Sequence, residues 1–146
     1  VGMGAMAAIL GLDFEDVKAI AAAGSNGGTC SAANDNSPGH VVVSGHKGAV
    51  EAAIALATER GAKRALLLPV SAPFHCPLMQ PAADEMTKAL SQTAMIAPCV
   101  PVVANVTAAA VSDPLVIRDL LVQQVTGVVR WRETVTWMKQ NGVDEM

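Results

Sequence analysis

The sequence has few aromatic and few charged residues, and it lacks several patterns that would indicate particular classes of protein. It contains no tyrosine, two phenylalanines and two tryptophans among 146 residues, and charged residues make up 16%. No apolar run approaches the roughly 20 residues that a membrane helix requires. The N-terminus lacks the basic segment and apolar stretch of a secretory signal. The sequence therefore predicts neither a membrane partner nor secretion, and it favours the cytoplasm.

The charge and the cysteines exclude further classes. The net charge is −3 and no cluster of lysines and arginines occurs, so nucleic acid is not an expected partner. Cys30, Cys76 and Cys99 are odd in number, far apart and without a C-x-x-C pair. They indicate neither a zinc site nor a disulfide framework, and they fit a reducing cytosol. The sequence predicts no metal and no cofactor.

Small apolar residues are abundant instead. Hydrophobic residues make up 51% of the chain, and alanine and valine dominate this share. Such a composition supplies a core and argues against disorder. With so few aromatic rings, we expect elements that pack closely through small side chains.

The first half alternates strand and helix signals. Short apolar runs that end at turn residues predict strands, and apolar residues at helical spacing predict helices. Asp13 is expected to cap the first helix, while Gly24 and Gly61 are expected just after the two helices. The expected elements are strands at 5–12, 29–35, 40–45 and 63–71, and helices at 14–23 and 47–60. This β-α-β-β-α-β order over residues 5–71 predicts a ferredoxin-like arrangement.

After residue 71 the pattern changes. Pro81 falls in the first turn of one expected helix, and Asp113 caps another whose first residue is Pro114. Pro101 lies within an expected strand, which must therefore be at the edge or end of a sheet. The expected elements are a helix at 79–93, a strand at 99–107, a helix at 115–125 and a helix at 132–141. One strand among helices indicates part of an α/β sheet whose other strands lie outside this sequence.

The stretch "SAPFHCPLM", residues 71–79, holds the most specific chemical signal. Pro73 and Pro77 fix the backbone on both sides of His75, and a general base requires such stiff placement. A simple loop residue is the alternative interpretation. Cys76 is predicted to be a buried thiol, because neighbouring residues of an extended loop point apart. Ser44 lacks the leading glycine of a nucleophile elbow. The residues alone therefore predict a base without a nucleophile.

Three stretches resemble one enzyme family. They are "NDNSPGHVVVSGHKGAVEAA", "GAKRALLLPVSAPFHCPLMQPAAD" and "PVVANVTA", in this order along the chain. The sequence is similar to the malonyl-CoA:acyl carrier protein transacylases of bacterial fatty-acid synthesis, which also occur as domains of polyketide synthases. The resemblance implies an α/β-hydrolase-like acyltransferase core with an inserted ferredoxin-like subdomain. It places residues 1–71 in the small subdomain and residues 72–146 in part of the core.

The resemblance also implies a mechanism and the residues that serve it. Malonyl-CoA is the substrate, a serine carries the malonyl group, and the phosphopantetheine thiol of acyl carrier protein receives it. His75 matches the histidine that deprotonates the serine and then the thiol. Gln124 matches the residue whose backbone carbonyl accepts the other ring N–H, with Gln123 as the neighbouring alternative.

Two further residues are expected to bind substrate through this resemblance. Phe74 matches a position where phenylalanine accompanies malonyl selection, because the ring crowds the α-methyl group of methylmalonyl. Loop packing is its alternative role. Asn36 matches an asparagine near the active site, for which we expect only positioning, and a turn residue before Pro38 is the alternative.

The family's Gly-His-Ser-x-Gly elbow, its Gly-Gln-Gly stretch and its carboxylate-binding arginine do not occur in this sequence. We therefore expect the 146 residues to be the middle and later part of a longer enzyme, and to be inactive alone. Two alternatives remain. One is an acyltransferase domain of a polyketide synthase. The other is a non-catalytic module that binds acyl carrier protein through Lys47, Lys63 and Arg64.

Overall fold

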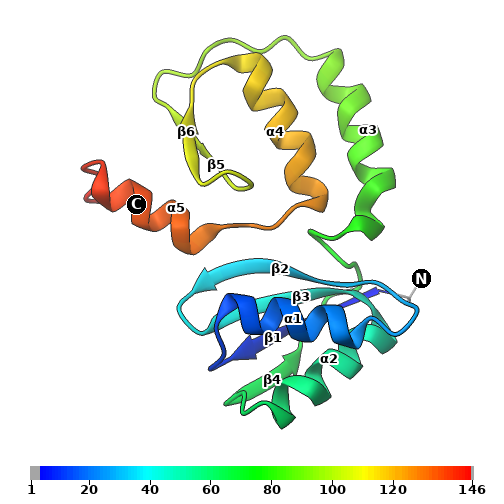
Figure 1. Ribbon diagram of the computed structural model, residues 1–146. Coiled ribbons are helices and arrows are strands. Elements are labelled where there is room, and N and C mark those ends of the chain that lie inside the picture. The colour runs from blue at the N-terminus through cyan, green and yellow to red at the C-terminus, as the bar shows by residue number, and fades with distance from the viewer. Residues whose placement is uncertain (1–3, 146) are drawn as a thin grey trace.

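The computed structural model describes residues 4–145, and its first half is a four-stranded antiparallel sheet with two helices on one face (Figure 1). The elements are β1 (Gly4–Leu10), α1 (Phe14–Gly24), β2 (Cys30–Ser37), β3 (His40–His46), α2 (Lys47–Glu59) and β4 (Arg64–Leu67). The strands are ordered β2-β3-β1-β4. This confirms the predicted ferredoxin-like arrangement. We refer to residues 4–67 as the sheet region.

Small side chains fill the core of the sheet region, as the composition predicts. Ala7, Ala53 and Ala57 are all fully buried between the sheet and its helices. The Asp13 carboxylate caps α1 by accepting from the backbone N–H of Asp16 at 2.9 Å. Gly24 differs from the prediction, because it is the last residue of α1 rather than the residue after it.

Gly24 has a packing role instead. A Cβ at this position would lie 2.9 Å from the backbone nitrogen of Ala53 and 3.1 Å from the carbonyl oxygen of Ala49, both in α2. Gly24 therefore lets the two helices approach closely. Gly61 has a φ of +86°, a conformation that favours glycine, and it follows α2 as predicted.

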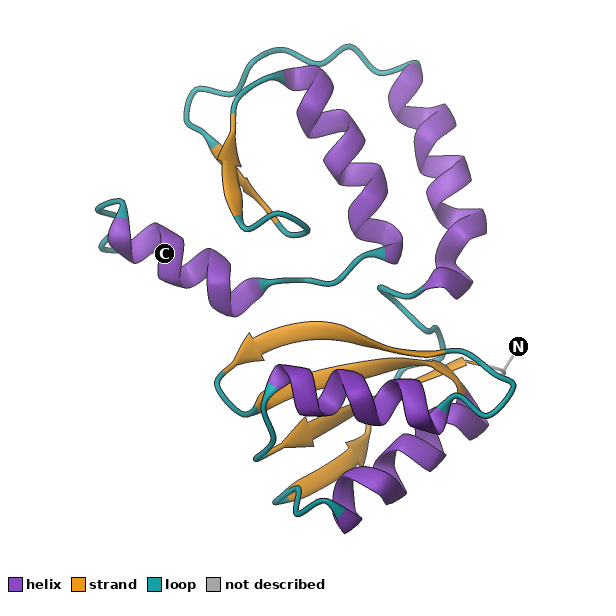
Figure 2. Cartoon of the chain, viewed as in Figure 1, coloured by secondary structure: helices purple, strands orange, loops and turns teal. Residues whose placement is uncertain are grey.

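The second half consists mostly of helices, with long loops between them (Figure 2). Its elements are η1 (Pro77–Met79), α3 (Gln80–Ser91), β5 (Val102–Ala104), β6 (Ala109–Val111), α4 (Pro114–Thr126) and α5 (Trp131–Gln140). Asp113 caps α4 as predicted, and its carboxylate accepts from the backbone N–H of Leu115 at 2.8 Å. Among residues 4–145, no helix combines the length and the apolar character needed to cross a membrane. We refer to residues 77–145 as the helical region.

The strand expected at 99–107 is shorter than predicted. Only Val102–Ala104 forms β5, and it pairs with β6 in a separate two-stranded antiparallel sheet. The chain turns between them through Ala108, which is buried and has a φ of +51°. β6 was not predicted, because three residues are too few to carry a strand signal.

The two regions meet at the edge of the four-stranded sheet. Val129 lies between α4 and α5 and forms an isolated parallel bridge with Asn34 of β2. The Val129 N–H donates to the Ala33 carbonyl at 2.9 Å, and the Asp35 N–H donates to the Val129 carbonyl at 2.9 Å. This pairing covers part of an otherwise open strand edge and fixes where α4 ends relative to β2.

Candidate functional site

His75 lies in the loop that leads from β4 into η1, and its backbone is unusual. Its φ is +56°, a left-handed conformation that few residues other than glycine adopt. Such a conformation costs about 1–3 kcal/mol and persists where the surroundings fix it. The Cys76 thiol donates to the Pro73 carbonyl at 3.1 Å, and the Met79 N–H donates to the Cys76 carbonyl at 3.0 Å. The loop around His75 is therefore held by its own hydrogen bonds.

The sheet region also supports this loop. A Cβ at Gly4, the first residue of β1, would lie only 2.5 Å from Cδ of Pro73. The pyrrolidine ring therefore packs directly on the β1 backbone, where only glycine leaves it room. The sequence predicts a stiff loop from its two prolines, and the structure adds a close contact between Pro73 and strand β1.

The His75 ring contacts the end of helix α4. Its Nδ1 lies 2.8 Å from the backbone carbonyl oxygen of Gln124. The last carbonyls of a helix lack partners within the helix, so this oxygen is available to the ring. The contact involves Gln124 and not Gln123, whose carbonyl accepts from the Gly127 N–H at 2.9 Å.

This contact has a chemical consequence. A carbonyl oxygen can only accept, so the hydrogen of a neutral His75 ring resides on Nδ1. Nε2 then carries the free lone pair and is the atom that can take a proton.

The end of α4 is braced by the turn between β5 and β6. The Asn105 side chain donates to the Gln124 side-chain oxygen at 3.4 Å, and the Asn105 carbonyl accepts from the Arg130 N–H at 3.0 Å. A Cβ at Gly127 would lie 2.8 Å from Cγ1 of Val106. Asn105 and Gly127 are thus contacts of the site that the sequence pattern did not single out.

The structure separates the two expected substrate-binding residues. Phe74 lies beside His75 in the chain, and 44% of its surface is exposed, so its ring is available to a ligand. Asn36 lies in β2 close to the turn before β3. The register places this turn beside Leu10, at the opposite end of β1 from the Gly4–Pro73 contact. The loop that carries His75 and the turn near Asn36 are therefore at opposite ends of the sheet.

Two other polar residues, Ser44 and His46, are part of strand β3. Ser44 lies in β3, is fully buried, and so cannot meet a substrate in this conformation. His46 is the last residue of β3. Its Nδ1 accepts from the Thr29 N–H at 2.9 Å and so fixes the start of β2. Burial, with a smaller contribution from Cys76, raises the pKa of the Cys30 thiol to about 11.

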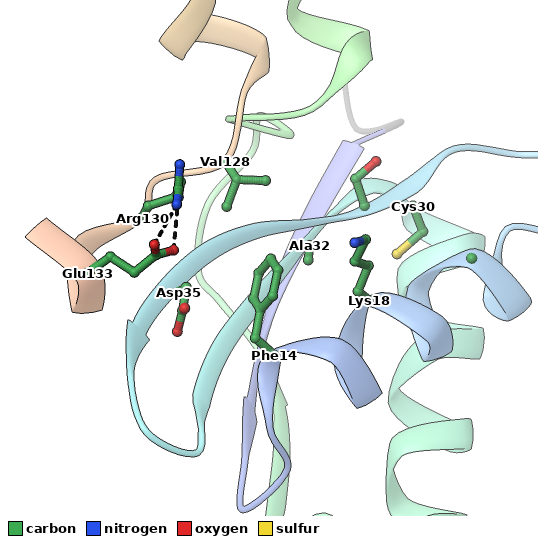
Figure 3. A pocket seen from close by; sticks show the side chains of 10 residues that line it. Phe14, Lys18, Cys30, Ala32, Asp35, Val128, Arg130 and Glu133 are labelled. Carbon is green, nitrogen blue, oxygen red and sulfur yellow. Dashed lines mark hydrogen bonds and ion pairs between the residues drawn. The ribbon is translucent and has the colours of Figure 1, made fainter. Parts of the chain in front are cut away.

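A groove of about 440 Å³ runs along α1, the edge of β2 and the segment that precedes α5 (Figure 3). Phe14 and Lys18 line one side, and Arg130 and Glu133 line the other. The Arg130 Nε donates to Glu133 at 2.8 Å, and this ion pair lowers the pKa of the Glu133 carboxyl. His75 does not line the groove, so the groove is separate from the candidate catalytic site.

Within residues 4–145, no cluster of three or more His, Cys, Asp or Glu residues could hold a metal ion. The described site consists of one imidazole, one helix-end carbonyl and an exposed ring. This arrangement can accept and return a proton, and it presents no nucleophile of its own.

Comparison with known proteins finds extensive similarity to one kind of enzyme. No family model matches the chain. A malonyl CoA-acyl carrier protein transacylase of Escherichia coli (strain K12) is 46% identical over 145 residues, which are 99% of this chain and 47% of the relative. The chain therefore spans about half the length of the curated relatives it matches.

Solved structures agree with this result. An acyl-carrier-protein-S-malonyltransferase from Bartonella henselae is 55% identical, with a TM-score of 0.94 over 99% of this chain and 46% of that one. A type II PKS acyl-carrier protein in complex with its malonyl-transacylase also matches, at 44% identity and a TM-score of 0.94, over 97% of this chain and 46% of that one. Along nearly its whole length, the chain is similar to malonyl CoA-acyl carrier protein transacylases, and it matches less than half the length of each of these relatives.

Proposed function

We propose that this segment supplies the catalytic base and the small subdomain of a malonyl-CoA:acyl carrier protein S-malonyltransferase. The contact between His75 Nδ1 and the Gln124 carbonyl carries the proposal, because it leaves Nε2 free as the proton acceptor. In this proposal residues 1–71 form the small subdomain, and residues 72–146 form part of the α/β core. The free thiols of the described cysteines support a cytoplasmic location.

The proposed reaction has two steps. A serine of the whole enzyme, outside this segment, attacks the thioester carbon of malonyl-CoA, and His75 Nε2 takes its proton. The bond to sulfur breaks, and coenzyme A leaves with that proton. His75 then deprotonates the phosphopantetheine thiol of acyl carrier protein, which attacks the malonyl-serine ester. The bond between the acyl carbon and the serine oxygen breaks, and the serine oxygen takes the proton from His75. Phe74 limits the acyl group to malonyl by crowding an α-methyl group.

The experiment is malonyl transfer to acyl carrier protein by the whole protein, with His75→Ala compared with the wild type. Loss of a positioned general base is expected to lower kcat roughly 100- to 10,000-fold. His40→Ala is the matched control, because His40 lies at the start of β3 beside the hairpin turn. Wild-type kcat in His75→Ala would overturn the proposal, because the whole protein would then transfer malonyl without His75 as a base.

A second candidate has an observation in its favour. One matching structure is a malonyl-transacylase in complex with a type II PKS acyl-carrier protein. The whole protein could therefore serve a polyketide carrier in place of a fatty-acid carrier. Comparing kcat/KM for the two kinds of carrier protein discriminates between them, and a preference for the fatty-acid carrier supports the first candidate.

A further inference from the structure

We infer that Asp35 and Arg132 are positioning residues for the base, because their ion pair fixes the end of α4 that holds His75. This inference rests on the proposed function of His75. The two residues are 97 positions apart, and they are hydrogen-bonded to each other, whereas the His75 ring is hydrogen-bonded to Gln124. They act through the Gln124 carbonyl, and three observations support this.

The first observation is that both partners of the His75–Gln124 contact are tied to the same sheet. Pro73, two residues before His75, packs against Gly4 at the start of β1. Val129, five residues after Gln124, pairs with β2 through two backbone hydrogen bonds of 2.9 Å. The distance between ring and carbonyl is therefore set by where these two segments attach to the four-stranded sheet.

The second observation is the ion pair itself. The Arg132 Nε lies 3.0 Å from both carboxylate oxygens of Asp35, and its Nη2 lies 2.8 Å from Oδ2. The Asp35 residue is only 2% exposed. A buried carboxylate needs a close cation, so the first turn of α5 cannot leave β2 without exposing Asp35 or leaving it unpaired. Hydrogen bonding to Asp35 raises the pKa of Arg132.

The third observation is that Asp35 binds the segment after α4 at two points. Its backbone N–H donates to the Val129 carbonyl, and its side chain accepts from Arg132 three residues further on. Arg130, between these two, reaches back to the carbonyls of Val106 and Thr107, beside Asn105. The chain that follows α4 is thus clamped between β2 and the β5–β6 turn.

Because the segment after α4 is held on both sides, the position of the Gln124 carbonyl is fixed. The carbonyl in turn keeps the neutral His75 ring in the Nδ1–H form that a base needs, with Nε2 free. Small misplacements of catalytic groups are costly, about 100-fold in rate for an error of about 1 Å. Loss of the ion pair is therefore expected to change the ring's tautomer and the rate together.

The test uses the whole protein with ¹⁵N-labelled histidine and the double variant Asp35→Asn/Arg132→Gln. Replacing both members leaves no buried charge unpaired, so this variant is the one expected to fold. The ¹⁵N shifts of the neutral His75 ring report the Nδ1–H population directly. We expect this population to fall, and kcat for malonyl transfer to fall roughly 10- to 100-fold. KM for malonyl-CoA should change less than kcat.

Two further variants keep the test decisive. Arg132→Lys retains the charge but loses the two-pronged donor, and we expect a smaller loss of the same kind. Glu85→Gln removes the exposed ion pair between Glu85 and Lys88 of α3, and it should change neither the tautomer nor kcat.

The outcomes separate the two proposals. The positioning role would be overturned if the tautomer and kcat were unchanged in a folded double variant or in Arg132→Lys. The proposed base would still stand in that case if His75→Ala lost malonyl transfer. A tautomer shift in the double variant, together with full activity of His75→Ala, would support the mechanical link and overturn the proposed base.

Discussion

The two regions of the molecule bury their apolar residues very differently. In the sheet region, Ile9, Val17 and Val43 are fully buried in one continuous core. In the helical region, Ile96 and Val100 of the loop after α3 and Leu115 of α4 are 89%, 71% and 62% exposed. The sheet region has one continuous core, whereas several large apolar side chains of the helical region are exposed in this structure. The candidate site lies where the loop that joins the two regions meets a helix end of the helical region.

This difference explains why the proposed base, His75, is held from the sheet side. The His75 loop rests on β1, and the segment after α4 is paired to β2. A rigid support of this kind suits a group that must stay within a narrow range of positions. The helical region contributes one carbonyl oxygen, and its position is set where the chain returns to the sheet.

The largest expected contrast is between two isoleucines. Ile9→Ala removes a fully buried side chain from β1 and should lower the free energy of unfolding by about 2–5 kcal/mol. Ile96→Ala removes one that is 89% exposed and should change it by less than about 0.5 kcal/mol. Urea denaturation measures both. Similar losses in the two variants would contradict the contrast between the regions.

Two glycines in helices of the sheet region should respond in opposite ways to replacement by alanine. Gly24→Ala places a Cβ against the α2 backbone and should destabilise the protein by about 1–3 kcal/mol. Gly48→Ala, inside α2, meets nothing within 4 Å and should stabilise by about 0.5–1 kcal/mol. Thermal unfolding followed by circular dichroism measures both. A neutral Gly24→Ala would mean that α1 and α2 are not in close contact.

The smallest contrast compares the helix caps of the two regions. Asp13→Ala and Asp113→Ala each remove a carboxylate that accepts from backbone N–H groups, and each should cost about 1 kcal/mol. We expect the first to lower hydrogen-exchange protection across the whole sheet region, because that region shares one core. The second should lower it only in α4. Loss of protection across both regions from Asp113→Ala would show that they unfold as one unit.

Much of the fold follows from local sequence patterns. The β-α-β-β-α-β order could be predicted because each strand ends at turn residues and each helix has its own apolar face. The position of Gly24 could not, because a glycine at a helix end and one at a helix contact look alike in sequence. The short β6 carries no periodicity and could not be predicted. The strand expected at 99–107 is longer than β5, which is Val102–Ala104.

Some parts of the candidate site could also be predicted from the sequence, and others could not. The two prolines around His75 made its stiffness predictable, and the family resemblance supplied Gln124 as the partner of its ring. The ion pair between Asp35 and Arg132 left no local signal, because it joins residues 97 apart. The position of Asn36 depends on the register of β2 and β3, which includes shifts that no alternation pattern encodes. Its role in substrate binding stays a prediction.

The most direct test of the account is the rate at which the whole protein gains a malonyl group from malonyl-CoA, followed by intact-protein mass spectrometry. This step needs the base but no carrier protein. We expect rapid adduct formation in the wild type and in His40→Ala, and formation slowed roughly 100-fold or more in His75→Ala. An adduct that forms in His75→Ala as fast as in the wild type would contradict the assignment of His75 as the base.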